Sequence, residues 1–309
     1  MITTMPSIAV LLAAYNGEKW IEEQIESIIN QKNVMVHIFV SVDLSTDNTL
    51  GILDMLSLKH ANITILNRGE IFGSPACNFY HLIFNTPIEE YDYIAFSDQD
   101  DIWLENKLFK AVNKLETHQA MGYSSDVNAF MENGKKKIIK KSYPQKEYDY
   151  LFEAPGPGCS FVLKKELLLL IKKAFITCPF LKKMDWYDWL IYAFSRANKY
   201  KWVIDNCSYI LYRQHNNNYI GVNFGWPAFL KRVKKVTSGY AMNQSILVIK
   251  FLQLENDPFV KTWYRNGMIH YLKLSLSAKK CRRNISDQFI FFLACIVMYM
   301  NTSSFHPSN

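Results

Sequence analysis

Residues 93–103 read YIAFSDQDDIW. The first four residues are largely apolar and predict a buried strand, and three carboxylates follow at Asp98, Asp100 and Asp101. Carboxylates this close raise one another's pKa unless a cation or hydrogen-bond donors compensate their charge. Because Mg2+ and Mn2+ take oxygen ligands, often a carboxylate or two together with substrate phosphates, the pattern favours a site for a metal ion and a diphosphate. The alternative is a solvated acidic turn before the next helix.

Strands and helices alternate along the N-terminal part of the chain. Apolar runs predict strands at 7–14, 34–42, 63–66 and 91–96, and apolar residues at helical spacing predict helices at 18–30, from 48 onward and at 74–84. This alternation predicts an α/β fold in which helices cover both faces of a parallel sheet. In such sheets, ligands bind beyond the carboxyl ends of the strands.

Polar residues follow the predicted strands at these carboxyl ends. Tyr15 and Asn16 follow the first strand, Asp43 ends the second, and Asp98 opens the acidic cluster after the fourth. We therefore expect them at one edge of the sheet, although they are far apart in sequence. The chain has no GxGxxG motif after the first strand and no GxxxxGK[ST] motif, so it lacks both common glycine-rich phosphate loops. A bound nucleotide would therefore need a metal ion to neutralise its phosphates.

The composition is that of a folded protein with an excess of positive charge. The 309 residues are 49% hydrophobic and carry a formal net charge of +7. Much of the excess lies in basic clusters at 135–141, 231–235 and 279–283. Such clusters suit nucleic acid or an anionic membrane surface. Because no nucleic-acid-binding motif accompanies them, we expect a membrane surface and no nucleic acid.

Cysteine usage and the N-terminus both favour the cytoplasm. The six cysteines form no CxxC pair, which argues against a zinc ribbon or a disulfide framework and favours reduced thiols. The N-terminal residues lack a positively charged region, and the apolar run at 8–14 is too short for a signal peptide. We expect this run to be the first strand of a cytoplasmic protein.

Further motifs lie around the acidic cluster. They are AAYNGEKWIEEQIESIINQ at 13–31, VDLSTDNT at 42–49, FSDQDDIWLENKL at 96–108, and the pair YDWL at 187–190 with YRQHNNN at 212–218. Together these motifs resemble those of family 2 glycosyltransferases with the GT-A fold. The pattern is most similar to that of bacterial rhamnosyltransferases that build O-antigen and capsular chains. It covers residues 8 to about 220.

The resemblance implies a nucleotide-sugar site at the sheet edge. Its donor-binding residues are expected to be Ala14, Tyr15, Asn16, Asp43, Asn78, Asp98, Gln99 and Arg213. Ala14 and Tyr15 match positions that pack on the base and ribose, and Asp43 matches the aspartate that hydrogen-bonds the pyrimidine. The family usually has a second aspartate just before this one, where this chain has Val42. Because Asp43 itself is retained, we expect base recognition to be kept.

The resemblance also implies a bound Mg2+ or Mn2+ ion. Asp98 and Asp100 match the family's Asp-x-Asp motif, with Asp100 as the direct metal ligand and Asp98 nearer the ribose and diphosphate. His215 matches a residue near the metal ion or the diphosphate. For His215, a hydrogen-bonded structural histidine is the alternative.

Asp188 matches the general base of the family, although it lies in Tyr-Asp-Trp where the family commonly has His-Asp-Trp or Glu-Asp. It begins an apolar helix, and Trp186, Tyr187 and Trp189 should partly desolvate it. Desolvation raises the pKa of a carboxylate toward the working range of a base. Asp185 is the main competitor for this role, and a capping role for Asp188 is the alternative.

The pattern changes in the last third of the chain. We predict a GT-A domain at 1–222 and a C-terminal helical region at 223–309. Residues 226–236 alternate apolar and basic side chains at helical spacing, which predicts an amphipathic helix suited to an anionic membrane surface. The apolar run at 289–300 is too short to span a membrane. We expect peripheral attachment to the inner face of the cytoplasmic membrane, with a buried helix or a dimer contact as the alternative.

These observations predict a metal-dependent, inverting glycosyltransferase. The resemblance points to transfer of L-rhamnose from dTDP-L-rhamnose to a lipid-linked oligosaccharide of O-antigen or capsular polysaccharide. A UDP-hexose donor is the first alternative. A nucleotidyltransferase would need a glycine-rich basic loop after the first strand, which is missing. A non-catalytic carbohydrate-assembly subunit would have no need to keep Asp43, Asp100 and Asp188.

Overall fold

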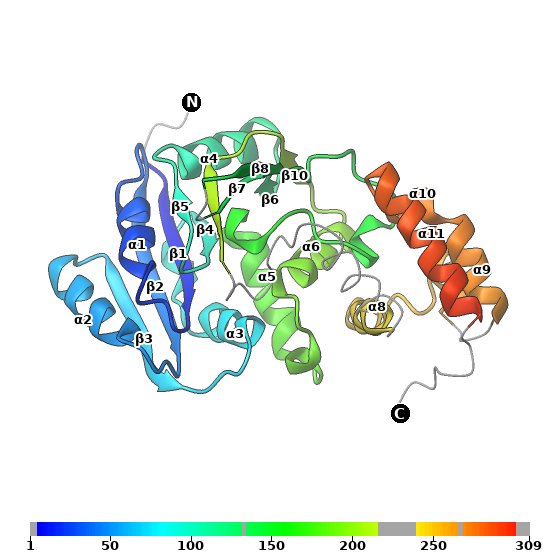
Figure 1. Cartoon of the computed structure of the whole chain (residues 1–309), viewed down its shortest axis with the longest axis horizontal. Coiled ribbons are helices and arrows are strands. Elements are labelled where there is room, and N and C mark those ends of the chain that lie inside the picture. Colours follow the sequence, from blue (N-terminus) through cyan, green and yellow to red (C-terminus); the bar gives the residue numbers. More distant parts are fainter. Residues whose placement is uncertain (1–4, 132–133, 216–238, 265–267, 301–309) are drawn as a thin grey trace. The chain divides into compact units, whose positions relative to one another are not determined.

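The computed structural model describes residues 5–131, 134–215, 239–264 and 268–300. The chain forms two compact units (Figure 1). The first comprises Met1–Ser142 and Pro155–Gly221, and the second comprises Tyr143–Ala154 and Val222–Asn309. The predicted domain boundary at residue 222 stays a prediction, and it did not anticipate that residues 143–154 belong to the C-terminal unit.

Seven of the described strands form the central sheet of the first unit. They are β1 (Ser7–Ala14), β2 (Met35–Asp43), β3 (Ile63–Glu70), β4 (Tyr93–Ser97), β6 (Gly122–Ser125), β9 (Val162–Lys164) and β10 (Trp202–Asp205), in the order β10-β6-β9-β4-β1-β2-β3. Neighbouring strands are parallel, as predicted, except that β9 is antiparallel to both β4 and β6. The parallel pairing predicted for the first four strands is confirmed, whereas β9, which was not predicted, runs antiparallel to its neighbours. The reason is that the turn at Gly158–Ser160 returns the chain into the sheet beside the carboxyl end of β4.

Helices cover both faces of this sheet, which confirms the predicted α/β architecture (Figure 1). One layer holds α1 (Ile21–Ile29), α2 (Thr49–Lys59) and α4 (Lys107–Thr117), and the other holds α3 (Pro75–Asn85), α5 (Lys165–Ile176) and α6 (Tyr187–Ala197), with short 3-10 turns at Ile88–Glu90, Gly158–Ser160 and Leu181–Lys183. Strand side chains alternate between the faces. Ile8, Val10 and Leu12 of β1 accordingly share one buried cluster with the first layer. On the other face, Phe79 of α3 contacts Phe96 of β4.

A second, smaller sheet supports the loop that follows β4. Its strands are β5 (Ile102–Trp103), β11 (Ile210–Gln214), β7 (Val127–Met131) and β8 (Lys136–Ile139), in that order. The antiparallel pairing of Ile102 with Leu211 brings the acidic loop next to the segment that ends in His215. The sequence did not predict this sheet, because its strands are short and pair with segments far away in the chain.

The second unit is helical, which confirms the predicted C-terminal helical extension. Its described elements are the 3-10 turns at Asp149–Leu151 and Val260–Thr262 and the helices α8 (Tyr240–Phe251), α9 (Met268–Leu276), α10 (Ala278–Cys281) and α11 (Ile285–Met300). The amphipathic helix predicted at 226–236 lies outside the described residues. Across the part of the chain that the structure describes, no helix has the length and apolar character needed to cross a membrane.

Two arginines of the basic cluster at 279–283 form ion pairs inside this unit. The Arg283 side chain is buried, with Nη1 3.0 Å from Asp149 Oδ2 and Nη2 3.5 Å from Glu153 Oε2. Arg282 also pairs with Glu153, at 3.7 Å. The prediction that this cluster faces an anionic partner is therefore wrong for Arg282 and Arg283, because carboxylates of the same unit already compensate their charge.

Replacing Arg283 by Met should leave the Asp149 carboxylate buried without its cation. We expect Arg283→Met to lower the free energy of unfolding by about 3–5 kcal/mol, measured by urea unfolding. Lys280→Met is the matched control, because Lys280 pairs with Glu147 at the surface and exposed pairs contribute only about 0–1 kcal/mol. Equal effects of the two substitutions would contradict the importance of the buried pair.

Candidate active site

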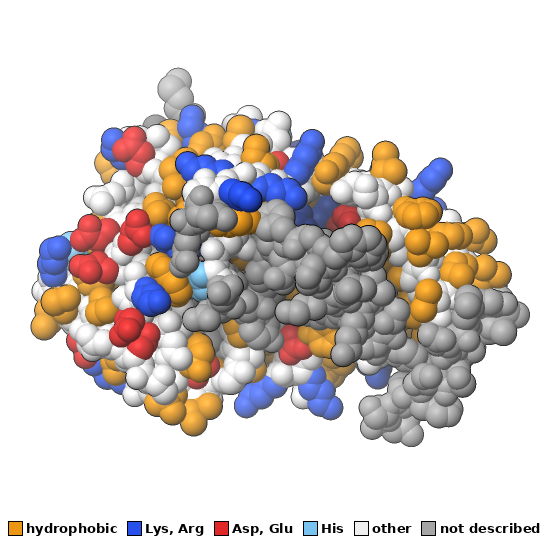
Figure 2. All heavy atoms as spheres, viewed as in Figure 1, with side chains coloured by type: hydrophobic (Ala, Val, Ile, Leu, Met, Phe, Trp, Pro, Cys, Tyr) orange, Lys and Arg blue, Asp and Glu red, His pale blue; other side chains and the backbone are white. Residues whose placement is uncertain are grey.

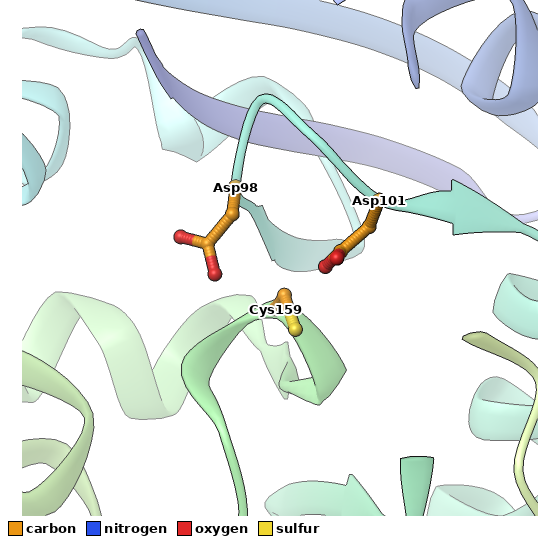
Figure 3. Close-up of side chains that lie close together, drawn as sticks. All are labelled: Asp98, Asp101 and Cys159. Carbon is orange, nitrogen blue, oxygen red and sulfur yellow. The ribbon is translucent and has the colours of Figure 1, made fainter. Parts of the chain in front are cut away.

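Two carboxylates of the acidic cluster lie close to Cys159 (Figure 3). Asp98 directly follows β4 and Asp101 directly precedes β5, so the loop between these strands holds one carboxylate at each end. Their carboxylate oxygens and the Cys159 sulfur lie within 4.8 Å of one another. Burial, together with the charges of Asp100 and Asp188, raises the pKa of Asp98 to about 7. Burial and the charges of Asp100 and Asp98 also raise the pKa of Asp101.

The third carboxylate, Asp100, contacts His215. Asp100 Oδ2 lies 2.8 Å from His215 Nε2, and both side chains are nearly buried. The His215 ring also stacks on Trp20, with the ring centroids 4.0 Å apart. The structure therefore brings together two of the predicted metal ligands, although 115 positions separate them in the sequence.

Arg213 supports the acidic loop from β11. Its backbone N–H donates to Asp101 Oδ1 at 3.1 Å, and its Nε donates to the backbone carbonyl of Asp100 at 2.9 Å. The guanidinium also pairs with Glu23 and lies over the Phe130 ring. The Arg213 side chain thus interacts with other protein groups, and these contacts explain the position of the loop. Its donor-binding role stays a prediction.

Asp188 lies in the first turn of α6, next to the same loop. The helix begins at Tyr187, so Asp188 is not its N-cap residue, although its Oδ1 accepts the backbone N–H of Trp189 at 2.7 Å. Burial raises the pKa of Asp188 to about 6. A Cβ on Gly158 would lie 3.3 Å from Asp188 Cβ and 2.0 Å from Tyr187 Oη. Gly158 thus allows the segment that carries Cys159 to approach the start of α6 closely.

Gln99 holds the backbone of Tyr15 at the end of β1. Its Oε1 accepts the Tyr15 N–H at 2.7 Å, and its Nε2 donates to the Tyr15 carbonyl at 2.7 Å. A Cβ on Gly17 would lie only 2.4 Å from Gln99 Oε1, so a larger residue there would displace the Gln99 amide. The Tyr15 side chain is more than half exposed. The structure therefore shows Gln99 as a support for Tyr15, and its predicted direct contact with the donor stays untested.

The other predicted donor residues interact with backbone groups of the sheet edge. The Asp43 carboxylate accepts the N–H groups of Leu44, Phe72 and Gly73, at 2.9, 2.9 and 3.1 Å. Asn16 Oδ1 accepts the Thr46 N–H, and Asn78 Nδ2 donates to the carbonyls of Ala14 and Ser41. Ala14 is buried, whereas Asp43 remains slightly exposed. These bonds tie the ends of β1 and β2 together, as their predicted meeting at one edge requires.

Asp98, Asp100 and His215 have the chemistry of a divalent-cation site. The two carboxylates supply the oxygen ligands that Mg2+ and Mn2+ prefer, and Asp100 already orients the His215 ring. Burial and the charges of Asp100 and Asp188 raise the pKa of Asp98, and a bound cation would stabilise its ionised form. Cys159 does not fit such an ion, because sulfur is a soft ligand and Mg2+ and Mn2+ prefer oxygen ligands.

Sequence reasoning missed the buried cation beneath this cluster. Lys107 is 2% exposed, and its Nζ lies 3.3 Å from the centroid of the Trp103 ring. Burial lowers the pKa of Lys107 to about 7, partly offset by the charge of Asp101. The four-residue spacing of Trp103 and Lys107, directly after the acidic cluster, was the sequence feature that could have indicated this contact. It went unused because a lysine at the start of a predicted helix is normally solvated.

Fold and site together define a sugar-transferring enzyme of the GT-A type. The family model described as glycosyl transferase family 2 matches residues 9–168, and the chain belongs to this family. It is 42% identical over 288 residues to the dTDP-rhamnosyl transferase RfbG of Shigella flexneri, which spans 93% of this chain and 99% of that protein. It is 29% identical over 187 residues to the UDP-Glc:alpha-D-GlcNAc-diphosphoundecaprenol beta-1,3-glucosyltransferase WfgD of Escherichia coli, covering 59% of this chain and 68% of WfgD.

Solved structures share the fold at low sequence identity. S. aureus TarS 1-349 in complex with UDP-GlcNAc has a TM-score of 0.56 and 14% identity, covering 96% of this chain and 89% of TarS 1-349. The mannosyltransferase PcManGT from Pyrobaculum calidifontis, in complex with GDP-Man and Mn2+, has a TM-score of 0.54 and 13% identity, covering 97% and 88%. These similarities confirm the predicted fold class.

Replacing Gln99 by Met keeps the side-chain length and removes both hydrogen bonds to Tyr15. Because each bond contributes about 1 kcal/mol, we expect KM for the nucleotide sugar to rise about tenfold, with a smaller change in kcat. Gln288→Met is the matched control, because it removes one hydrogen bond from a side-chain amide to the backbone carbonyl of Arg282 in the second unit. An unchanged KM in Gln99→Met would show that Tyr15 is positioned without Gln99.

Proposed function

We propose that this glycosyltransferase moves L-rhamnose from dTDP-L-rhamnose, with inversion, onto a lipid-linked oligosaccharide of an O-antigen or capsular polysaccharide. The donor is supported by the 42% identity to a protein named dTDP-rhamnosyl transferase, over nearly the whole length of both chains. The reaction type is supported by one observation above all. Asp188 lies close enough to the acidic loop that its charge, with that of Asp100, acts on Asp98.

Asp188 is proposed as the general base. In an inverting transfer the acceptor hydroxyl attacks the anomeric carbon from the side opposite the leaving diphosphate, so a base must accept the hydroxyl proton on that side. A pKa of about 6 suits this task, because the carboxylate is ionised at neutral pH yet basic enough to take a proton. The proton of the acceptor hydroxyl ends on the Asp188 carboxylate.

The donor is proposed to bind along the edge formed by β1, β2 and the acidic loop. Tyr15 presents an exposed ring beside the buried Ala14, and the Asp43 carboxylate, which is 8% exposed, would accept a hydrogen bond from the pyrimidine ring. Asp98, Asp100 and His215 would hold a Mg2+ or Mn2+ ion. When bound, such an ion neutralises charge on the leaving diphosphate. Arg213 and His215 orient the loop through Asp100.

The acceptor is proposed to be held in a membrane, and the enzyme to act at the inner face of the cytoplasmic membrane without spanning it. This is supported by WfgD, whose name includes a diphosphoundecaprenol-linked sugar, and by the net charge of +7. A UDP-hexose donor is the second candidate, because WfgD and another relative are named as UDP-Glc-dependent glucosyltransferases. Their lower identity and shorter coverage favour the rhamnose donor.

Replacing Asp188 by Asn should remove the base and keep the shape of the site. Because general-base catalysis contributes about 10²–10⁴-fold, we expect kcat to fall by at least about a hundredfold while donor binding changes little. In the wild type, kcat/KM should fall about tenfold per pH unit below pH 6, since protonated Asp188 cannot accept a proton. Asp185→Asn, three positions earlier, is the control. Full activity of Asp188→Asn, or an equal loss in Asp185→Asn, would refute the assignment.

The donor can be identified by thermal stabilisation in the presence of Mn2+. Ligands that bind only the folded state raise the melting temperature according to their affinity. We expect dTDP-L-rhamnose to raise it more than dTDP-glucose, UDP-glucose or GDP-mannose at equal concentration, and we expect Asp100→Asn or removal of the ion with EDTA to reduce the rise. A larger rise with UDP-glucose would establish the second candidate instead.

A further inference from the structure

Helix α11 is apolar on two opposite faces. Its inner face is buried within the second unit: Cys295 is inaccessible, and Phe291 packs edge-on against Phe152 with ring centroids 5.0 Å apart. Its outer face is also apolar, yet Ile285, Phe289 and Leu293 are 81%, 63% and 45% exposed. These three residues are spaced four apart and therefore form one stripe. A helix that is apolar all round is normally buried. The exposed outer face of α11 is therefore expected to contact another apolar surface.

The neighbouring helix α9 extends this apolar surface. It packs against α11 within the second unit and exposes Leu272 and Leu276, again four residues apart. Ile290 of α11 is also exposed. Figure 2 shows hydrophobic side chains gathered over this part of the molecule. Together, Leu272, Leu276, Ile285, Phe289, Ile290 and Leu293 form what we call the α9–α11 face. Contiguous exposed apolar patches on soluble proteins usually mark binding surfaces.

Exposed charge near the α9–α11 face is mainly positive. Lys273 and Lys279 are exposed, and neither forms an ion pair with any residue that the structure describes. Asp287 at the start of α11 lies 3.8 Å from Arg282, which also pairs with Glu153. Lysines beside exposed apolar side chains are the pattern by which peripheral proteins bind the interface of an anionic bilayer.

The same features disfavour other uses of the α9–α11 face. The 16-residue α11 is shorter than the roughly 20 residues needed to span a bilayer, so it suits lying along the surface. A second copy of the chain would bring Lys273 and Lys279 of both copies to one interface, and such like-charge contacts are unfavourable. An anionic lipid surface compensates these charges and accepts the apolar side chains at the same time.

We propose that the α9–α11 face is the surface by which this protein binds an anionic lipid bilayer. The inference deepens the proposed function, since a lipid-linked acceptor would reside in that bilayer. The exposed apolar residues that support it do not depend on which donor binds. It also differs from the membrane contact expected at residues 226–236, because it uses exposed apolar side chains of α9 and α11.

Vesicle flotation of the full-length protein tests the proposal, with phosphatidylcholine vesicles containing about a third phosphatidylglycerol, at low salt and without nucleotide sugar. We expect Phe289→Ser/Leu293→Ser to weaken vesicle binding at least tenfold, because each buried CH₂ group contributes about 0.8 kcal/mol. Lys273→Glu/Lys279→Glu should weaken it at least tenfold as well, and only on anionic vesicles, since each lysine contributes about 1 kcal/mol. All substituted side chains are exposed, so the melting temperature should not change.

Matched controls carry the same substitutions on the first unit. Leu58 is 90% exposed on α2 and Met55 is 56% exposed, and Lys110 and Lys173 are exposed lysines. Leu58→Ser/Met55→Ser and Lys110→Glu/Lys173→Glu should bind vesicles like the wild type. Wild-type binding by the α9–α11 variants, or an equal loss in the controls, overturns the proposal.

Light scattering of the same variants tests whether the α9–α11 face instead joins two copies of the chain. A wild-type dimer that dissociates in Phe289→Ser/Leu293→Ser, without vesicle binding by the wild type, would show that the face joins two copies and would also overturn the proposal. Because the flotation contains no donor, a wrong donor assignment leaves its result unchanged. The two proposals can therefore fail separately.

Discussion

The negative charge of the acidic loop is the constraint on which the first unit depends. Asp98, Asp100 and Asp101 lie within four consecutive positions, and burial makes their ionised forms costly. The protein compensates part of this charge through Arg213 of β11 and His215, which follows β11, by their contacts to Asp100 and Asp101. Burial and the charges of Asp100 and Asp188 still raise the pKa of Asp98, and a cation would stabilise its ionised form.

Close backbone approaches hold this charged loop in place. Gly17 makes room for the Gln99 amide, which holds Tyr15 of the β1 end, and Gly158 makes room for the start of α6. A side chain at either glycine would clash at 2.4 Å or less. The loop is therefore held from two sides by groups whose positions depend on packed strands and helices. Sites built on such rigid elements keep their geometry better than sites on free loops.

In the second unit, charged side chains lie in the interior and large apolar side chains lie at the surface. Its interior contains ionised groups, because Arg283 and Asp149 are buried together, while its surface exposes large apolar side chains on α9 and α11. A buried ion pair stabilises little relative to apolar packing, and exposed apolar side chains lose the benefit of burial. Both features reduce stability in water. Contact with an apolar medium would bury the exposed side chains of α9 and α11 and so restore their stabilising effect.

Local pattern alone predicted much of this molecule. The apolar runs correctly indicated β1, β2 and β4, because a buried strand needs a continuous apolar sequence, and their carboxyl ends correctly indicated where Tyr15, Asp43 and Asp98 would meet. The acidic cluster and the apolar, aromatic surroundings of Asp188 predicted raised pKa values, since both effects arise from near neighbours in sequence.

Only the tertiary structure decided how these residues are supported. The reversed direction of β9, the pairing of β5 with β11, and the bonds of Gln99 to Tyr15 join segments separated by dozens of positions, and no local periodicity encodes such partners. The burial of Lys107 and Arg283 likewise depends on what packs over them, because a basic side chain looks solvated in sequence until its neighbours in space are known. Sequence by itself thus determined β1, β2, β4 and the acidic edge, and the fold decided which charges are compensated there.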